Sequence, residues 1–63
     1  MHTMASAELI RELKQAGWLL ERISGSHHGF KHPSRPGVVV VPQPKKDLGK
    51  GLVKAIRKQA GLE

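Results

Sequence analysis

Apolar residues recur at helical spacing near both ends of the chain. The first set consists of Leu9, Ile10, Leu13 and Ala16. This spacing matches the period of an α-helix. Ser6 and Glu8 predict the helix start, because a hydroxyl can cap free backbone amides and an acid is favoured near the positive end of the helix dipole. Gly17 then favours the helix end.

Between the two helical patterns, the sequence is typical of short strands. Residues 18–23 are rich in large apolar side chains, and residues 24–26, Ser-Gly-Ser, predict a turn. Residues 27–32 then form a second strand and complete a hairpin. A cluster of turn-forming residues follows at 33–37, and four consecutive valines at 38–41 predict the third strand.

A second amphipathic helix is predicted near the C-terminus. Pro42 and Pro44 end the third strand, because proline cannot donate to the ladder, and they open an irregular basic loop over 45–51. The next apolar set, at helical spacing, is Leu52, Val53, Ile56 and Ala60. Gly61 favours the end of this helix. Its other face carries Lys50, Lys54, Arg57 and Lys58.

These elements predict an α+β fold with the order α-β-β-β-α. Short connections favour a three-stranded antiparallel sheet with two helices on one face, leaving the other face open. Residues 6–62 form a single predicted domain. Residues 1–5 show no periodicity and contain a second candidate start at Met4 besides Met1, so we interpret them as a disordered leader and assign His2 no function.

Charge narrows the classes of partner. Eleven Lys and Arg residues against five Asp and Glu residues give a net charge of +6. Residues 1–32 carry four basic and three acidic side chains (+1), whereas residues 33–63 carry seven and two (+5). Such a field attracts nucleic acid, an anionic membrane surface or an acidic protein. Because the chain has no cysteine, no membrane-spanning apolar stretch and no signal-peptide pattern, we expect a cytoplasmic protein without a membrane role.

Alternation along the second strand identifies a candidate acid or base. One face should hold His27, Gly29 and Lys31, and the other His28, Phe30 and His32. Phe30 is the natural core residue, so His27 and Lys31 should point to solvent together. Imidazole can accept the proton of a ribose 2′-hydroxyl near neutral pH, and lysine can stabilise charge on a phosphorane. The alternative interpretation of His27 is an ordinary polar residue beside a turn.

Lysines after the third strand suggest a phosphate-binding loop. Lys45 and Lys46 precede Gly49 and Gly51 beside a helix start, where ammonium groups and free amides favour phosphate. The alternative is a solvated loop that only aids solubility.

Three further side chains have structural interpretations. His28 is an auxiliary candidate together with Ser26, but on the Phe30 face it is better explained as a partly buried histidine with a hydrogen bond. Trp18 directly follows a helix-ending glycine, so core packing is favoured over stacking on a base. No metal site is expected, because one of the three nearby histidines points away and no carboxylate or thiolate lies beside them.

Several short segments together resemble a known family. They are Glu8-Leu9-Ile10, Gly17-Trp18, Gly25-Ser26-His27-His28, Phe30, His32-Pro33, Val41-Pro42, Lys45-Lys46-Asp47-Leu48, Gly51 and Ala60-Gly61-Leu62. Over residues 6–62 the chain resembles the HicA toxins of the HicA/HicB type II toxin-antitoxin systems, which are mRNA interferases. The resemblance implies a fold like the double-stranded RNA-binding domain. It also implies a metal-independent endoribonuclease without a cofactor, in which His27 is essential, and a HicB antitoxin that covers His27.

Three functional hypotheses follow. In the first, His27 cleaves mRNA while basic side chains bind its phosphates; those side chains are Lys31, Lys45, Lys46, Lys50 and Lys54. In the second, the same face binds RNA without cutting it. In the third, the charge serves only to meet an acidic protein partner, and RNA binding is weak and steeply salt-dependent.

Overall fold

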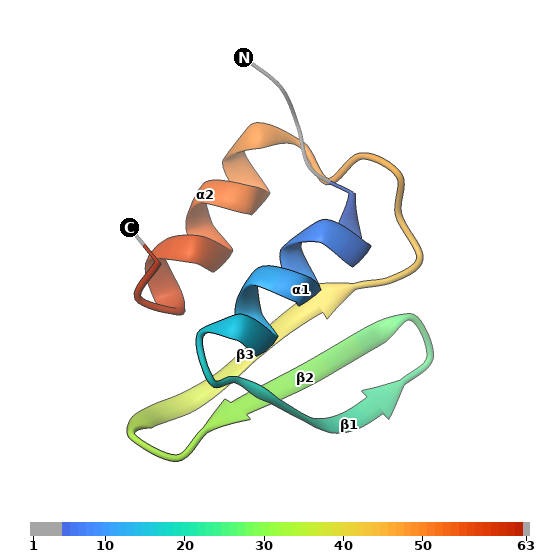
Figure 1. Cartoon of the computed structure of the whole chain (residues 1–63). Helices are drawn as coiled ribbons and strands as arrows, with labels where there is room; N and C mark the ends of the chain where they lie inside the picture. Colours follow the sequence, from blue (N-terminus) through green and yellow to red (C-terminus); the bar gives the residue numbers. More distant parts are fainter. Residues whose placement is uncertain (1–4, 63) are drawn as a thin grey trace.

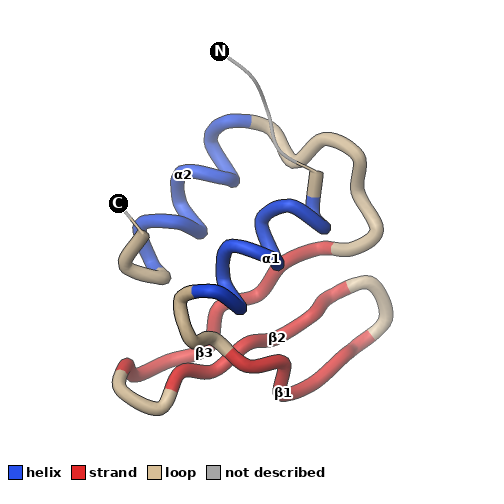
Figure 2. The backbone as a smooth tube through the Cα atoms, viewed as in Figure 1, coloured by secondary structure: helices blue, strands red, loops and turns tan. Residues whose placement is uncertain are grey.

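The computed structural model describes residues 5–62, which form one three-stranded sheet and two helices. The elements are α1 (Ser6–Gln15), β1 (Leu19–Ser24), β2 (His27–His32), β3 (Arg35–Pro42) and α2 (Lys50–Gln59). The strands are antiparallel in the order β1-β2-β3. Both helices lie on the same side of the sheet (Figure 1), and the connections are short except for the loop over 43–49 between β3 and α2 (Figure 2). The predicted α-β-β-β-α fold is therefore confirmed.

The core lies between the helices and one face of the sheet. Its buried apolar side chains are Leu9, Ile10, Leu13, Trp18, Phe30, Val39, Val41, Leu48, Ile56 and Ala60. Trp18 is only 1% exposed, which confirms its predicted packing role. Leu52, predicted on the apolar face of α2, is 42% exposed, and Leu48 of the preceding loop is buried instead. The helix also begins at Lys50, inside the predicted loop.

The start of α1 differs from the prediction in the role of Ser6. Ala5 is the N-cap residue, and Ser6 is the first helical residue and is buried. The Oγ atom of Ser6 accepts a hydrogen bond from the Lys45 backbone N–H (3.0 Å) and donates one to the Lys45 carbonyl oxygen (3.2 Å). Glu8 accepts a hydrogen bond from the Ala5 N–H at 3.0 Å. The hydroxyl of Ser6 thus anchors the loop after β3 and does not cap the helix.

His32 fixes the end of β2 against the end of α1. Its Nδ1 atom accepts a hydrogen bond from the Ser34 N–H at 2.9 Å, so the ring proton belongs on Nε2, which donates to the Ala16 carbonyl oxygen at 3.0 Å. The His32 ring also meets the Trp18 ring edge-on, with centroids 5.2 Å apart. These contacts assign His32 a structural role.

The two edges of the sheet are built differently. β3 begins at Arg35, three residues earlier than predicted, because Arg35 already pairs with His32 after a two-residue turn. On this edge the Gln59 side chain of α2 donates a hydrogen bond to the Val38 carbonyl oxygen at 3.1 Å. On the other edge the pairing shifts by one residue at Glu21, forming a β-bulge in β1.

None of the helices within residues 5–62 is long and apolar enough to cross a membrane.

Candidate functional site

His27 occupies the first position of β2, directly after the turn that joins it to β1. Its backbone pairs with Ser24 on one side and with Pro42 on the other, and its side chain is exposed. Phe30 of the same strand is buried under the helices, so alternation directs His27 to the open face of the sheet, as predicted. A histidine held by two neighbouring strands has a fixed backbone and a side chain that a ligand can reach.

The loop after β3 lies beside the turn that carries His27. The Gln43 backbone N–H donates a hydrogen bond to the Ser26 carbonyl oxygen at 2.6 Å, which joins the two segments (Figure 1). The same loop is held to α1 by Ser6, through three hydrogen bonds with the backbone of Lys45. The Ser26 and Lys45 side chains are exposed. Fixed backbones at both segments therefore place His27 and the lysine loop at one end of the sheet.

The remainder of that loop leads into α2. Asp47 Oδ1 accepts a hydrogen bond from the Gly49 N–H at 3.0 Å, forming a local turn before the helix. Lys45 and Lys46 are exposed, and no carboxylate in residues 5–62 forms an ion pair with either. Two ammonium groups without acidic partners provide a positive potential at the end of the sheet where His27 lies.

The remaining predicted phosphate binders are more dispersed. Lys31 shares the open face with His27 but lies four residues along β2, about 13 Å away at the usual strand rise. It forms an ion pair with Glu21 at 3.5 Å. Lys50 and Lys54 are exposed on α2, within the helical layer. The structure thus groups Lys45 and Lys46 with His27, whereas Lys31, Lys50 and Lys54 occupy other parts of the surface.

His28 is half-buried on the helix side of the sheet, opposite Ile23 and Val41. Its Nδ1 atom is buried and has no hydrogen-bond partner among the described residues. The hydrogen bond expected for a structural histidine is therefore missing at this atom. Because His28 and His27 point to opposite faces, the two imidazoles do not converge on one reacting group.

A hollow on the open face extends from His27 across all three strands. It measures ≈ 370 Å³ and is lined by Arg22, Ser24, His27, Gly29, Val38 and Val40. Gly29 is buried between two of these side chains: a Cβ atom there would come within 3.2 Å of Arg22 Cγ and 3.3 Å of Val38 Cγ1. The sequence pattern identified His27 but not Arg22, Val38 or Val40. Their position on this face depends on the bulge at Glu21 and on the strand register.

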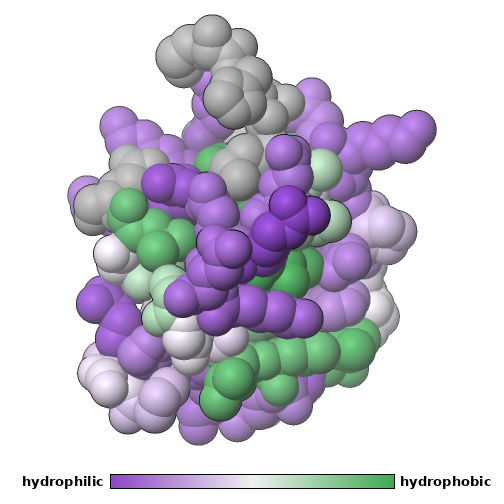
Figure 3. Space-filling view, viewed as in Figure 1, coloured by the Kyte–Doolittle hydropathy of each residue, from purple (hydrophilic) through white to green (hydrophobic). Residues whose placement is uncertain are grey.

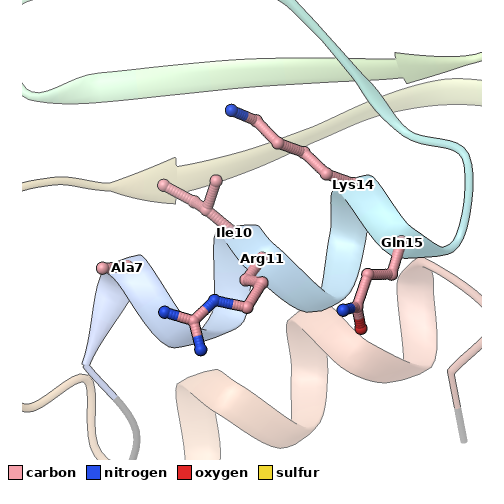
Figure 4. Close-up of a pocket in the computed structure, with 5 residues that line it drawn as sticks. All are labelled: Ala7, Ile10, Arg11, Lys14 and Gln15. Carbon is pink, nitrogen blue, oxygen red and sulfur yellow. The ribbon is translucent and has the colours of Figure 1, made fainter.

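Another hollow lies along α1, in the helical layer (Figure 4). It measures ≈ 420 Å³ and is lined by Ala7, Ile10, Arg11, Lys14 and Gln15. Figure 4 shows that Arg11 and Lys14 extend in different directions. Because their charged groups do not converge, this hollow offers no common position for one phosphate.

Exposed apolar side chains gather on β1, where Figure 3 shows a green band at the lower edge of the molecule. Leu19, Leu20 and Ile23 are 65%, 44% and 59% exposed. An apolar patch on an edge strand is a typical contact surface for another protein.

Within residues 5–62, no three His, Asp or Glu side chains come together as candidate metal ligands.

Comparisons with known proteins identify related chains. Residues 6–62 match the family model described as "HicA toxin of bacterial toxin-antitoxin". Among solved structures, the chain is similar to one from the "HicA3 and HicB3 toxin-antitoxin complex", with 37% sequence identity and a TM-score of 0.81. That likeness covers 92% of this chain and 94% of the other. A search of curated proteins finds no match.

Proposed function

Since this chain belongs to the HicA toxin family of bacterial toxin-antitoxin systems, we propose that it is an endoribonuclease that cleaves mRNA with His27 as its acid/base residue. The observation that carries the proposal is the position of His27. It is exposed on the open sheet face, beside a hollow and next to the loop of Lys45 and Lys46. Because the substrate is mRNA, we place the activity in the cytoplasm.

The proposed reaction uses the 2′-hydroxyl of the RNA itself. His27 removes the 2′-hydroxyl proton, the 2′ oxygen forms a bond to the adjacent phosphorus, and the bond from phosphorus to the 5′ oxygen breaks. The leaving 5′ oxygen takes a proton from solvent, so the products are a 2′,3′-cyclic phosphate and a 5′-hydroxyl. Nearby cations stabilise the negative charge that develops on phosphorus-bound oxygens. No metal or cofactor enters this scheme.

Charge supports RNA as the substrate. The net charge of +6 favours a polyanion, and Lys45 and Lys46 are supplied by a loop that hydrogen bonds hold against both α1 and the His27 turn. Lys50 and Lys54 extend the positive surface along α2. We propose that these four lysines contact the RNA backbone and that Lys31 contributes only after leaving Glu21. Ser26 and His28 remain auxiliary candidates.

A second part of the proposal concerns the partner. The similar solved chain is part of a complex of HicA3 with HicB3. We propose that a HicB-type antitoxin binds this chain, covers His27 and blocks RNA. The exposed apolar residues of β1 and the cationic loop would favour a partner surface that is both apolar and acidic.

The decisive experiment is cleavage of a labelled single-stranded RNA, in the presence of chelator, by the wild-type chain and by His27→Gln. Circular dichroism confirms that both are folded. A matched RNA with a single 2′-deoxy nucleotide at the cut site tests the reaction chemistry. We expect cleavage only by the wild type and only of the all-ribose substrate. Equal cleavage by both proteins would show that His27 is not the acid/base residue. RNA binding without cleavage by either protein would favour the non-catalytic RNA-binding module.

A competition experiment tests the partner. With a HicB-type antitoxin added in equimolar amount, we expect cleavage to stop and RNA to be displaced. A ternary complex that still contains RNA at full occupancy would contradict the proposal.

A further inference from the structure

We propose that the hollow on the open sheet face is a subsite for one nucleotide of the RNA strand, in which Arg22 binds the phosphate beside His27 and Val38 and Val40 support the adjoining base. The proposal rests on the proposed ribonuclease function and assigns part of its substrate contacts. Arg22, Gly29 and the two valines line this hollow together with His27.

Arg22 is placed to reach a phosphate held near His27. Its backbone pairs with Gly29, and Gly29 lies two residues from His27 on the same face of β2. The stem of Arg22 passes over Gly29, because a Cβ atom there would be 3.2 Å from Arg22 Cγ. At the usual strand rise, Gly29 and His27 are about 7 Å apart along β2, a distance that an arginine side chain can cover.

Arg22 is also free to bind an anion. Neither of the ion pairs within residues 5–62 includes it, and the adjacent acid, Glu21, pairs with Lys31. A guanidinium group presents a planar fork of N–H donors that matches two phosphate oxygens. An exposed arginine without an acidic partner, on the same hollow as an exposed histidine, therefore supplies both charge and donors for a phosphodiester.

The other wall of the hollow is apolar. Val38 and Val40 are 37% and 45% exposed on β3, although the neighbouring Val39 and Val41 are buried beneath the helices. Gly29 is buried between this wall and Arg22, and the Arg22 Cγ and Val38 Cγ1 atoms fill the space that a Cβ atom would need. The volume of ≈ 370 Å³ lies in the range of small-ligand sites, roughly 300–1,000 Å³.

Neither the tryptophan nor the phenylalanine of the chain can stack on a base at this face. The chain has one Trp, one Phe and no Tyr, and both Trp18 and Phe30 are 1% exposed in the core. Single-stranded RNA is usually held by aromatic side chains or by arginine planes. The valines are therefore the apolar support that this face offers to a base, and the preference among bases should be weak because no polar side chain of β3 lines this wall.

Arginine substitutions provide the first test. Arg22→Gln and Arg11→Gln each remove one exposed positive charge, but Arg11 lies on α1, in the helical layer. At saturating single-stranded RNA, we expect Arg22→Gln to lower the cleavage rate roughly 100-fold, as for loss of one oxyanion donor. Arg11→Gln should change it less than about twofold, as expected for a charge that does not touch the substrate. Arg22→Lys should restore only part of the rate, since the fork is lost. Equal effects at the two positions would overturn the role of Arg22.

Binding to an inactive variant provides the second test and does not depend on cleavage. His27→Gln is titrated with a short single-stranded RNA while backbone amide NMR signals are followed. We expect the largest shifts at Gly29, Val38 and Val40, and a weaker affinity for Val40→Asp in the same background. Shifts confined to α1 and α2 would overturn the subsite even if the wild type cuts RNA. Shifts at the hollow with no cleavage by the wild type would keep the subsite and reject the nuclease.

Discussion

The indole Nε1–H of Trp18 donates a hydrogen bond to the backbone carbonyl oxygen of Ala60 at 3.2 Å, so the residue that precedes β1 is bound to the end of α2. The two residues are 42 positions apart, and both are buried. This contact links the segment between α1 and β1 to the end of α2 through one side chain.

Replacement of Trp18 by phenylalanine removes this hydrogen bond and leaves a buried carbonyl oxygen without its partner. We expect Trp18→Phe to lower the free energy of unfolding by about 2 kcal/mol or more, from the unsatisfied acceptor and the smaller ring. Urea denaturation followed by circular dichroism measures this loss. Leu19→Ala, at a 65% exposed neighbour, is the control and should cost less than about 0.5 kcal/mol. Similar losses for both would show that the Trp18 contact contributes little.

Alanine substitutions at two glycines with positive φ distinguish the cost of backbone strain from the cost of a steric clash. Gly17 (φ 98°) and Gly37 (φ 85°) both adopt backbone conformations that disfavour other residues. A Cβ atom at Gly37 meets nothing within 4 Å, whereas one at Gly17 would lie 2.7 Å from His32 Nε2. We expect Gly37→Ala to cost about 1–2 kcal/mol and Gly17→Ala to cost clearly more, because His32 must also leave its hydrogen bonds. Equal free energies of unfolding would contradict the structural role of His32.

Ser6 connects stability with the proposed RNA-binding loop. Ser6→Ala keeps the helical backbone but leaves the Lys45 N–H without its acceptor. We expect a loss of about 1–2 kcal/mol in the free energy of unfolding. We also expect faster amide hydrogen exchange at Lys45 and weaker RNA binding, although no phosphate contact is removed. Ala7→Ser, at the exposed next position of α1, is the control and should leave RNA affinity unchanged. Unchanged exchange at Lys45 in Ser6→Ala would show that other contacts hold the loop.

An ion pair between Glu12 and Arg57 joins the two helices. Both side chains are partly exposed, so Glu12→Gln should cost only about 0.5–1 kcal/mol, and the loss should shrink in high salt. Glu21→Gln breaks the more exposed pair with Lys31 and should cost less. Thermal unfolding of both variants at low and high salt measures which variant loses more stability. A larger loss of stability in Glu21→Gln than in Glu12→Gln would contradict the greater contribution expected of the Glu12–Arg57 pair.

The sequence pattern predicted the helices and strands and the faces that they bury, because short-range periodicity controls these features. Helical spacing at Leu9 and Leu13, and the four valines of β3, identify elements that bury one face. Alternation placed His27 and Phe30 on opposite faces of β2, and the structure agrees. These features depend only on neighbours within a turn or a strand.

Other features depend on contacts between distant segments and were not predictable from the sequence. Ser6 has the residue type of an N-cap, but its hydroxyl is used by Lys45, 39 positions away. Leu48 lies between a basic segment and a glycine, with no periodic partner to mark it as buried. Arg22 reaches the open face only because the bulge at Glu21 shifts the alternation of β1, and a bulge has no local sequence signature here.

The unequal edges of the sheet bear on whether copies of the chain can pair strand to strand when the protein concentration rises. On the β3 side, the Gln59 amide already occupies the Val38 carbonyl oxygen that a new strand would need. On the β1 side, the bulge at Glu21 interrupts the regular row of hydrogen-bonding groups next to exposed leucines. Edge strands that are covered or bulged resist pairing with copies of themselves. The sheet is therefore poorly suited to grow into aggregates from either edge.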